Sequence, residues 1–380
     1  MTTVAGAPLL EALSEVSDFR KSRGKRHALV AILALGCVAA LCGCSSLTAI
    51  SQWGRHHSAE IMRRLGFTHL PGPSIATLHR VFSHLEAAAL EQALSAWWQA
   101  WLPVRGALAL DGKTVRGSGG ADQPALQVLA AFAGQVRVVL AQQAISHGDQ
   151  IGAALALLEG VDLQGWIVTG DAKLTQKAIV ERVLAQGGDY VLTAKANQPT
   201  LCDDIATLFA EPQVVAETIT TTQRIDLHGS RIEVRRLQAS SALTAEYTGW
   251  PGLQQVFRLE RCRIDKRSGQ RTTTVVFGIT SLPPDCADAK RLAALSRSHW
   301  NIENRLHWVR DVAFAEDASR IRTGQAPQVM SILRNVAISF LGLLAYDSPT
   351  EGLRHFAWNA AEAIDLVTKP PVLAPRAKMK

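Results

Sequence analysis

Three acidic residues stand where a carboxylate can do chemistry. Asp111 follows the apolar run ALAL and Asp171 follows GWIVTG, so each ends a predicted strand. Glu303 lies in HWNIENRLHWVRDV, residues 299–312, a predicted helix with cationic and titratable side chains. Strand ends at the edge of an α/β sheet, where loops open to solvent, are the usual place for an active site. An aspartate after a strand also caps turns and helices, so either aspartate alone fits a structural role equally well.

Helical spacing predicts the direction of Glu303. An apolar stripe with intervals of three and four residues packs on the core and comprises Ile302, Leu306, Val309 and Ala313. The neighbouring stripe is polar and comprises Ser296, His299, Glu303, His307 and Arg310. Glu303 is therefore expected at the rim of the buried face, able to point inward across the sheet.

Three other interpretations of this helix stay open. A solvated face of ion pairs would contribute only about a few tenths of a kcal/mol. A zinc site of His299, Glu303 and His307 would lack the order HExxH and an evident fourth ligand. Asp311 lies eight residues after Glu303 on nearly the same helix face, and could serve as the third acid instead.

The composition indicates a folded, basic chain. With 380 residues, of which 47% are hydrophobic and 19% charged, the chain can form two or three units with a real core. The net charge of +7 favours polyanionic partners without identifying one. The six cysteines match no zinc-site spacing and are interpreted as reduced core residues of a cytosolic protein.

An uncharged stretch, residues 28–54, is long enough to span a bilayer. Much of it is Ala, Gly, Ser and Cys, which insert weakly into a membrane. We therefore interpret the stretch as a buried, closely packed helix of a soluble protein. A signal peptide is disfavoured because the preceding segment is long and contains Glu11, Glu15 and Asp18.

The chain changes character along its length. Residues 1–100 are typical of a helical module, and from residue 105 strands and helices alternate as in βαβ units. Residues 211–280 alternate Thr, Arg and apolar types, which predicts an antiparallel β segment, with ten basic against seven acidic residues. The remainder is predicted to be helical up to the tail KPPVLAPRAKMK, which is predicted to be disordered.

Three ordered motifs resemble the signature regions of DDE-type bacterial insertion-sequence transposases, in the branch that includes the H-repeat-associated proteins. They are LALDGKTVRGS, VTGDAKLTQKAIVERVLAQGGDYVLTAKANQPTL and SRSHWNIENRLHWVRDVAFAEDASR. The segment SIATLHRVFSHLE and the residues before it resemble the N-terminal associated domain of that branch. The resemblance therefore covers nearly the whole chain, and three motifs in order are more specific than any one of them.

The resemblance implies an α/β, ribonuclease-H-like catalytic core over residues 101–345, with Asp111, Asp171 and Glu303 as its acidic triad. It also implies a β-rich insertion, which matches residues 211–280, between the core strands and the helix of the last acid. A C-terminal helix and tail would occupy residues 346–380. The wider family has Tyr, Arg, Glu and Lys at fixed offsets around the last acid; here these offsets hold Ser296, His299, Glu303 and Arg310. The last cation keeps its charge, whereas the Tyr is absent and the Arg is a His.

Cleavage of a phosphodiester needs an activated water and a stabilised leaving oxygen, and a pair of divalent ions supplies both. Hard ions such as Mg²⁺, or Mn²⁺ in its place, prefer carboxylate oxygens, which is why three acids suit the site. Nearby cationic and polar side chains are candidates for contacts with DNA phosphates. These candidates are Lys113, Arg116, Lys195, Asn197, Gln198, His299, His307 and Arg310.

The sequence as a whole predicts a DNA transposase, which cleaves a strand at the end of an element and joins it to target DNA. Its partners would be both DNAs and a second copy of the chain, in the bacterial cytoplasm at the nucleoid and not in a membrane. The N-terminal helices, with residues 74–84 as a possible recognition helix, would help read the end sequence. The alternatives are a metal-dependent nuclease that does not join strands, and an inactive DNA-binding relic.

Overall fold

The computed structural model describes residues 6–102, 105–121, 123–211 and 216–370. Two compact units divide the chain. The first contains residues 1–104, 112–149 and 302–380, and the second contains residues 105–111 and 150–301. Neither unit is a continuous stretch, so the consecutive domain boundaries expected from the sequence stay a prediction. Most of the basic tail falls outside the described residues.

Nine strands form a mixed sheet in the order β3-β2-β1-β4-β5-β9-β8-β7-β6. The strands are β1 (Ala107–Val115), β2 (Leu126–Ala133), β3 (Val138–Ala144), β4 (Ile167–Gly170), β5 (Asp189–Ala194), β6 (Ile219–Leu227), β7 (Arg231–Ser240), β8 (Gln255–Asp265) and β9 (Arg271–Thr280). Strand β1 belongs to both units, because its first half lies in the second unit and its second half in the first. The sheet and the helical N-terminal region confirm the predicted α/β class with a ribonuclease-H-like core.

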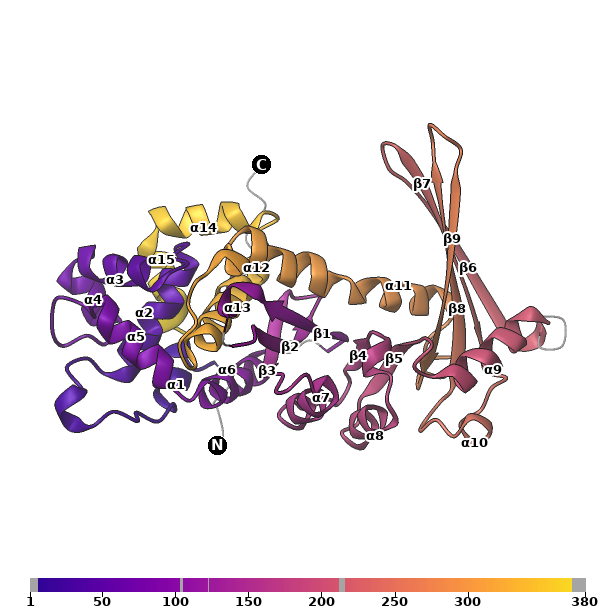
Figure 1. Ribbon diagram of the computed structural model, residues 1–380, viewed down its shortest axis with the longest axis horizontal. Helices are drawn as coiled ribbons and strands as arrows, with labels where there is room; N and C mark the ends of the chain where they lie inside the picture. The colour runs from indigo at the N-terminus through magenta and orange to yellow at the C-terminus, as the bar shows by residue number, and fades with distance from the viewer. Residues whose placement is uncertain (1–5, 103–104, 122, 212–215, 371–380) are drawn as a thin grey trace. The chain divides into compact units, whose positions relative to one another are not determined.

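Strands β1, β4 and β5 run parallel, as predicted from their apolar sequences. All four residues of β4 are buried, which is typical of a parallel strand covered on both faces. Helix α8 (Lys177–Ala185) connects β4 to β5 and packs against α7 (Gln150–Glu159), which precedes β4 (Figure 1). These crossovers bring the ends of β1 and β4 to the same edge of the sheet.

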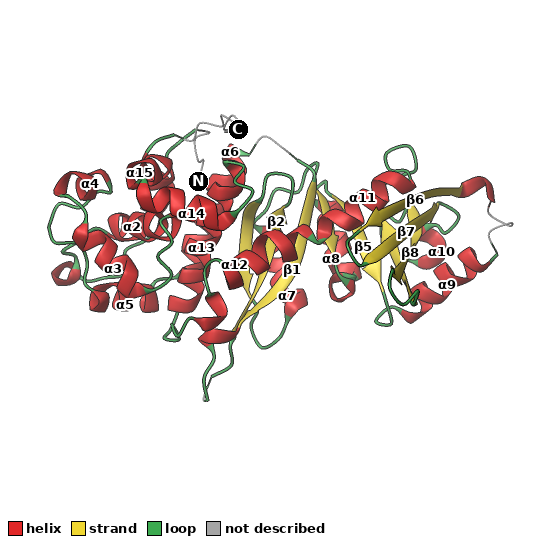
Figure 2. Ribbon diagram, turned by 90° about the horizontal axis from the view of Figure 1, so that it is seen from above, coloured by secondary structure: helices red, strands yellow, loops and turns green. Residues whose placement is uncertain are grey.

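Helices dominate the first unit (Figure 2). They are α1 (Leu9–Ser14), α2 (Leu29–Leu41), α3 (Leu47–His56), α4 (Ala59–Arg64), α5 (Ile75–His84), α6 (Ala87–Trp101), α12 (Trp308–Val312), α13 (Ala326–Leu343), α14 (Pro349–Trp358) and α15 (Ala360–Thr368). Helix α2 is buried on nearly every side because α1, α3, α13, α14 and α15 all pack on it. Its uniformly apolar composition is therefore that of a core helix.

The uncharged stretch 28–54 forms two helices, where the sequence predicted one. Helix α2 ends at Leu41, Gly43 takes a left-handed conformation with φ 84°, and the Ser46 side chain caps α3. Among the described residues, α13 is the helix that is long and apolar enough to cross a membrane, and 83% of its apolar window is buried in the protein.

The predicted β segment forms the antiparallel strands β6 to β9 of the second unit (Figure 1). The second unit also holds α9 (Pro199–Ala210), α10 (Ala245–Thr248) and α11 (Ala289–His299). Helix α11 buries Leu292 and Leu295 against a core that includes Phe257. Gly278 is required opposite this ring, because a Cβ there would lie 2.1 Å from the Phe257 ring.

Candidate active site

Asp111 and Asp171 occupy equivalent places on neighbouring parallel strands. The register pairs Leu110 of β1 with Gly170 of β4, and each aspartate is the next residue. Both side chains are partly exposed. The sequence placed Asp111 at a strand end, but β1 continues to Val115. What ends before Asp111 is the pairing with β4, so the carboxylate still lies where the two strands part.

Asp171 also has the structural role that the sequence left open. Its Oδ1 accepts a hydrogen bond of 3.0 Å from the backbone N–H of Lys173 and caps a short 3-10 turn, Ala172–Leu174. The amides of Asn197 and Gln198 donate to the carbonyls of Ala172 and Thr175, at 2.6 and 2.9 Å. These two side chains therefore hold the loop after Asp171, a role that the prediction of DNA contacts did not include.

His299 and Lys195 stay in the second unit with Asp171. The Nδ1 of His299 lies 3.1 Å from the Oγ1 of Thr169 on β4, two residues before Asp171. Lys195 follows β5 directly and is exposed. Lys195 therefore lies in the loop after a parallel strand, whereas His299 ends α11 and contacts the strand that precedes Asp171.

Glu303 begins a π-helical turn, Glu303–His307, which leads into α12. A π-helical turn contains one more residue than an α-helical turn, so it rotates the residues after it around the helix axis. The expected apolar stripe is confirmed at Ile302, Leu306 and Val309, which are buried. The expected polar stripe is not confirmed, because Glu303 is exposed whereas His307 and Arg310 point into the protein.

Glu303 and His307 form a hydrogen-bonded pair. The imidazole Nδ1 lies 2.9 Å from Oε2 of the carboxylate, and the side-chain exposures are 5% for His307 and 56% for Glu303. The hydrogen bond with His307 lowers the pKa of Glu303; burial opposes it, and the charge of Lys113 adds to it, so the pKa lies below the usual range. Glu303 is therefore ionised at neutral pH and suited to binding a cation.

Arg310 lies in the core and not at a DNA surface, which corrects the sequence-based expectation. Its guanidinium is fully buried and donates to both oxygens of Glu316, at 2.7 and 3.0 Å. Arg334 donates to the same carboxylate at 2.9 Å. Further hydrogen bonds join Arg310 to Ser331 and Gln142. Arg310 therefore anchors the helix behind Glu303, because none of its charge reaches solvent.

Lys113 and Asp311 form an ion pair at 2.6 Å, and Lys113 is almost entirely buried. Asp311 was the rival candidate for the third acid, and this pair gives it a different role. Lys113 is accordingly a structural cation beside Glu303 and not an exposed DNA contact. Arg116 follows on the same segment and is 81% exposed, with its guanidinium 3.7 Å from Asp317, so it remains available to a phosphate.

Sequence reasoning missed the network that Glu316 makes with the two arginines. Glu316 is fully buried, yet it lies in AEDASR, where it resembles any surface acid. Arg334 is hidden in the same way within the apolar α13. One signal was present: an arginine within an otherwise apolar helix needs a buried partner.

Comparison with known proteins identifies the family of the chain. Residues 10–98 match the DDE_Tnp_1-associated domain, and residues 103–340 match the transposase DDE domain. YncI of Escherichia coli O157:H7, which is named as a transposase, is 31% identical over 88% of this chain and 87% of its own. YhhI of E. coli K12, named as an H repeat-associated transposase, is 28% identical over 88% and 90%.

The mixed sheet and the helical N-terminal region are those of a protein of the transposase class. The match to the transposase DDE domain covers more than half of the chain, and the chain belongs to the family of DDE-type insertion-sequence transposases. Membership implies DNA as a partner and divalent metal ions as cofactors.

Proposed function

We propose that this protein cleaves a DNA strand at the end of an insertion sequence and transfers it to target DNA, with Asp111, Asp171 and Glu303 as the catalytic acids. The observation that supports the proposal is the register of β1 and β4, in which Leu110 pairs with Gly170 and each aspartate is the next residue. Two carboxylates on adjacent strands would repel each other without a cation. The pair is therefore chemically suited to a divalent ion.

The available donors fit a hard metal ion. Carboxylate oxygens are the preferred ligands of Mg²⁺, and Mn²⁺ accepts carboxylate and imidazole together. Asp111 and Glu303 are carboxylates, and His307 joins them as a candidate ligand. When bound, a pair of ions activates the attacking oxygen and stabilises the leaving oxygen.

The chain's own residues would bind and orient the DNA. Cationic or titratable groups come from Arg116 after β1, Lys195 after β5 and His299 beside Thr169 of β4, and these groups suit the phosphates that flank the cut. Asn197 and Gln198 keep the loop of Asp171 in place through their carbonyl contacts. The N-terminal helices, including α5, would read the end sequence, and the protein would act in the cytoplasm at the nucleoid.

Incubation of the purified chain with a plasmid and a labelled DNA end tests the proposal. Cleaved strands and joined products are expected with Mg²⁺ and are expected to vanish with EDTA. Asp171→Asn, purified by the same procedure, is the control for nucleases that co-purify with the chain. Cleavage without joining would favour a nuclease. DNA binding without any metal-dependent cleavage would identify an inactive relic.

We also propose that a second copy of the chain docks on the free face of strands β6 to β8. The register aligns Ile225, Val234 and Cys262 in one row across these strands. The next row on the same face holds Leu227, Ile232 and Ile264. Leu227 is 71% exposed, and such a contiguous apolar face indicates an interaction surface.

The apolar rows favour a second copy over DNA, because DNA offers no partner for aliphatic side chains. Arg236 pairs in register with Glu260 in the row that borders the apolar residues, and Glu260 also binds Arg258 of its own chain at 3.1 Å. A two-fold interface joins the same patch on both subunits, so the apolar rows of each copy can cover those of the other.

Leu227→Asp is expected to convert a dimer to a monomer, because it places a charge within the apolar face. Sedimentation of the full-length chain with and without DNA measures this change. Ile151→Asp is the matched control, since Ile151 is an exposed aliphatic residue of α7. A wild type that stays monomeric in both conditions would contradict the docking surface.

A further inference from the structure

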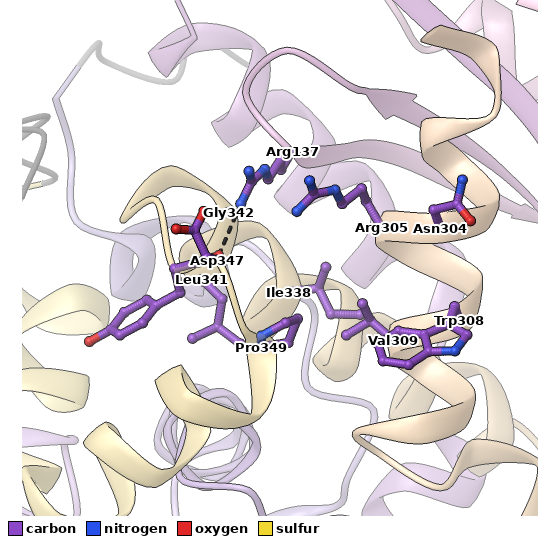
Figure 3. A pocket seen from close by; sticks show the side chains of 11 residues that line it. Arg137, Asn304, Arg305, Trp308, Val309, Ile338, Leu341, Gly342, Asp347 and Pro349 are labelled. Atoms are coloured by element: carbon purple, nitrogen blue, oxygen red, sulfur yellow. Dashed lines mark hydrogen bonds between the residues drawn. The ribbon is translucent and has the colours of Figure 1, made fainter. Parts of the chain in front are cut away.

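A small cavity in the first unit lies beside the turn that carries Glu303. It encloses about 120 Å³ and is lined by eleven residues. Arg137 comes from the connection between β2 and β3, Asn304 and Arg305 come from the π-helical turn, and Trp308 begins α12 (Figure 3). Two guanidinium groups thus face one cavity, and none of the groups proposed for catalysis lines it.

Arg137 is held in a costly conformation at this cavity. It has a left-handed backbone with φ 58°, which is uncommon for a residue other than Gly, Asn or Asp. Its guanidinium donates a 2.9 Å hydrogen bond to the carbonyl of Tyr346. The chain also approaches Gly342 so closely that a Cβ there would lie 2.4 Å from the Cβ of Arg137. Such a conformation persists only where the surrounding structure fixes the residue.

The charges of the cavity do not balance. Burial lowers the pKa of Arg137, and the nearby charge of Arg305 lowers it further, while Asp347 opposes this shift. Asp347 and Arg305 are both exposed. Within the described part of the chain Arg305 makes no ion pair. Two cations therefore face one acid, which leaves an excess positive charge for an anion.

We propose that this cavity binds one phosphate group of a DNA strand, and this inference rests on the proposed function. The two guanidiniums can donate several hydrogen bonds to the oxygens of a phosphate. A cavity of about 120 Å³ has room for one phosphate group. The attached sugar would lie outside the cavity on Trp308, whose side chain is 52% exposed.

The position of the cavity suggests what the bound phosphate would do. Arg305 is two residues from Glu303 on the same turn, so the two side chains leave different sides of it. A strand anchored at Arg305 would therefore be held at a phosphate other than the one that is cut, which orients the strand relative to Glu303. The cavity is accordingly a positioning subsite for DNA.

Charge variants of the full-length chain test the subsite by fluorescence anisotropy of a labelled DNA over a range of salt concentrations. Arg305→Ala is expected to weaken binding about tenfold at low salt and to reduce the slope of log K against log salt by about one. Asp347→Asn, which removes the opposing acid, is expected to strengthen binding. Trp308→Ala is expected to weaken it without changing the salt slope.

Arg354→Ala is the matched control, because Arg354 is an exposed arginine of α14 away from the cavity. Wild-type affinity and salt slope in Arg305→Ala would overturn the subsite while leaving the proposed function intact. Calorimetry with inorganic phosphate shows whether the cavity takes free phosphate and not a phosphate of DNA. If Arg305→Ala loses phosphate binding but binds DNA as the wild type does, the DNA subsite is also overturned. A wild type that binds no DNA would instead contradict the proposed function itself.

Discussion

Replacing Glu303 with Gln is expected to lower metal-dependent cleavage about a thousandfold while leaving the melting temperature unchanged. The amide keeps the shape of the side chain but removes the charge that a divalent ion requires. A loss of about 4 kcal/mol in transition-state stabilisation corresponds to this factor. Folding is insensitive to the change because the Glu303 side chain is 56% exposed. Single-turnover cleavage and thermal unfolding of the same preparation measure both effects.

Asp311→Asn provides the contrast and is expected to show the opposite pattern. Asp311 pairs with the almost fully buried Lys113 at 2.6 Å, so its removal leaves a buried ammonium without its counter-charge. The expected cost is about 1 to 3 kcal/mol of stability with most cleavage retained. If Asp311→Asn abolished cleavage and Glu303→Gln did not, the third acid would be Asp311. The affinity of each variant for DNA shows whether a loss of cleavage results from weaker DNA binding.

The sequence could predict the features that depend on periodicity and strand order. The apolar runs before Asp111 and Asp171 predicted two strands, and the structure pairs them in parallel with Leu110 opposite Gly170. The alternation in residues 211–280 predicted an antiparallel segment, which the structure forms as β6 to β9. Both patterns result from the alternating direction of side chains along a strand, so they can be recognised without knowledge of the tertiary contacts.

The directions of His307 and Arg310 could not be predicted in the same way. A regular helix of 3.6 residues per turn sets both beside Glu303 on one polar stripe, but the π-helical turn at Glu303–His307 rotates them inward. Two of the partners of Arg310, Gln142 and Ser331, lie far away in the sequence. A cation on a predicted rim therefore resembled a DNA contact until its tertiary partners were known.

The buried arginines also explain how the turn of Glu303 keeps its position. Arg310 of α12 is fixed to Glu316, and Arg334 of α13 to the same carboxylate. The backbone N–H of Val139 on β3 donates a 3.0 Å hydrogen bond to the hydroxyl of Ser339 on α13, which ties β3 to the same core. Glu303 is thus exposed on a helix whose opposite side is fixed, which suits an acid that must hold a metal in one geometry.

Replacing Glu316 with Ala is expected to destabilise the protein by about 3 to 5 kcal/mol, because it leaves two buried guanidiniums without a counter-charge. Glu316 and Arg310 are 0% exposed and Arg334 only 2%. Urea-induced unfolding at neutral pH measures the change. Glu362→Ala is the control, since Glu362 forms an exposed pair with His355 and its loss is expected to cost less than about 1 kcal/mol. An equally small loss at Glu316 would contradict the role of the network.

The stability difference between wild type and Glu316→Ala is also expected to depend on pH, in a direction that follows from the pKa of Glu316. Burial raises the pKa of Glu316, but the charges of Arg310 and Arg334 outweigh it, so the folded-state pKa lies below the ordinary value. The stabilisation by Glu316 is therefore present above the unfolded-state pKa, about 4.3, and is lost as the pH falls through the folded-state value. The difference in unfolding free energy between wild type and Glu316→Ala is accordingly expected to be constant near neutral pH and to shrink in acid. A difference that grows as the pH falls would mean that the carboxyl is protonated in the folded protein, and the two arginines would then need another counter-charge.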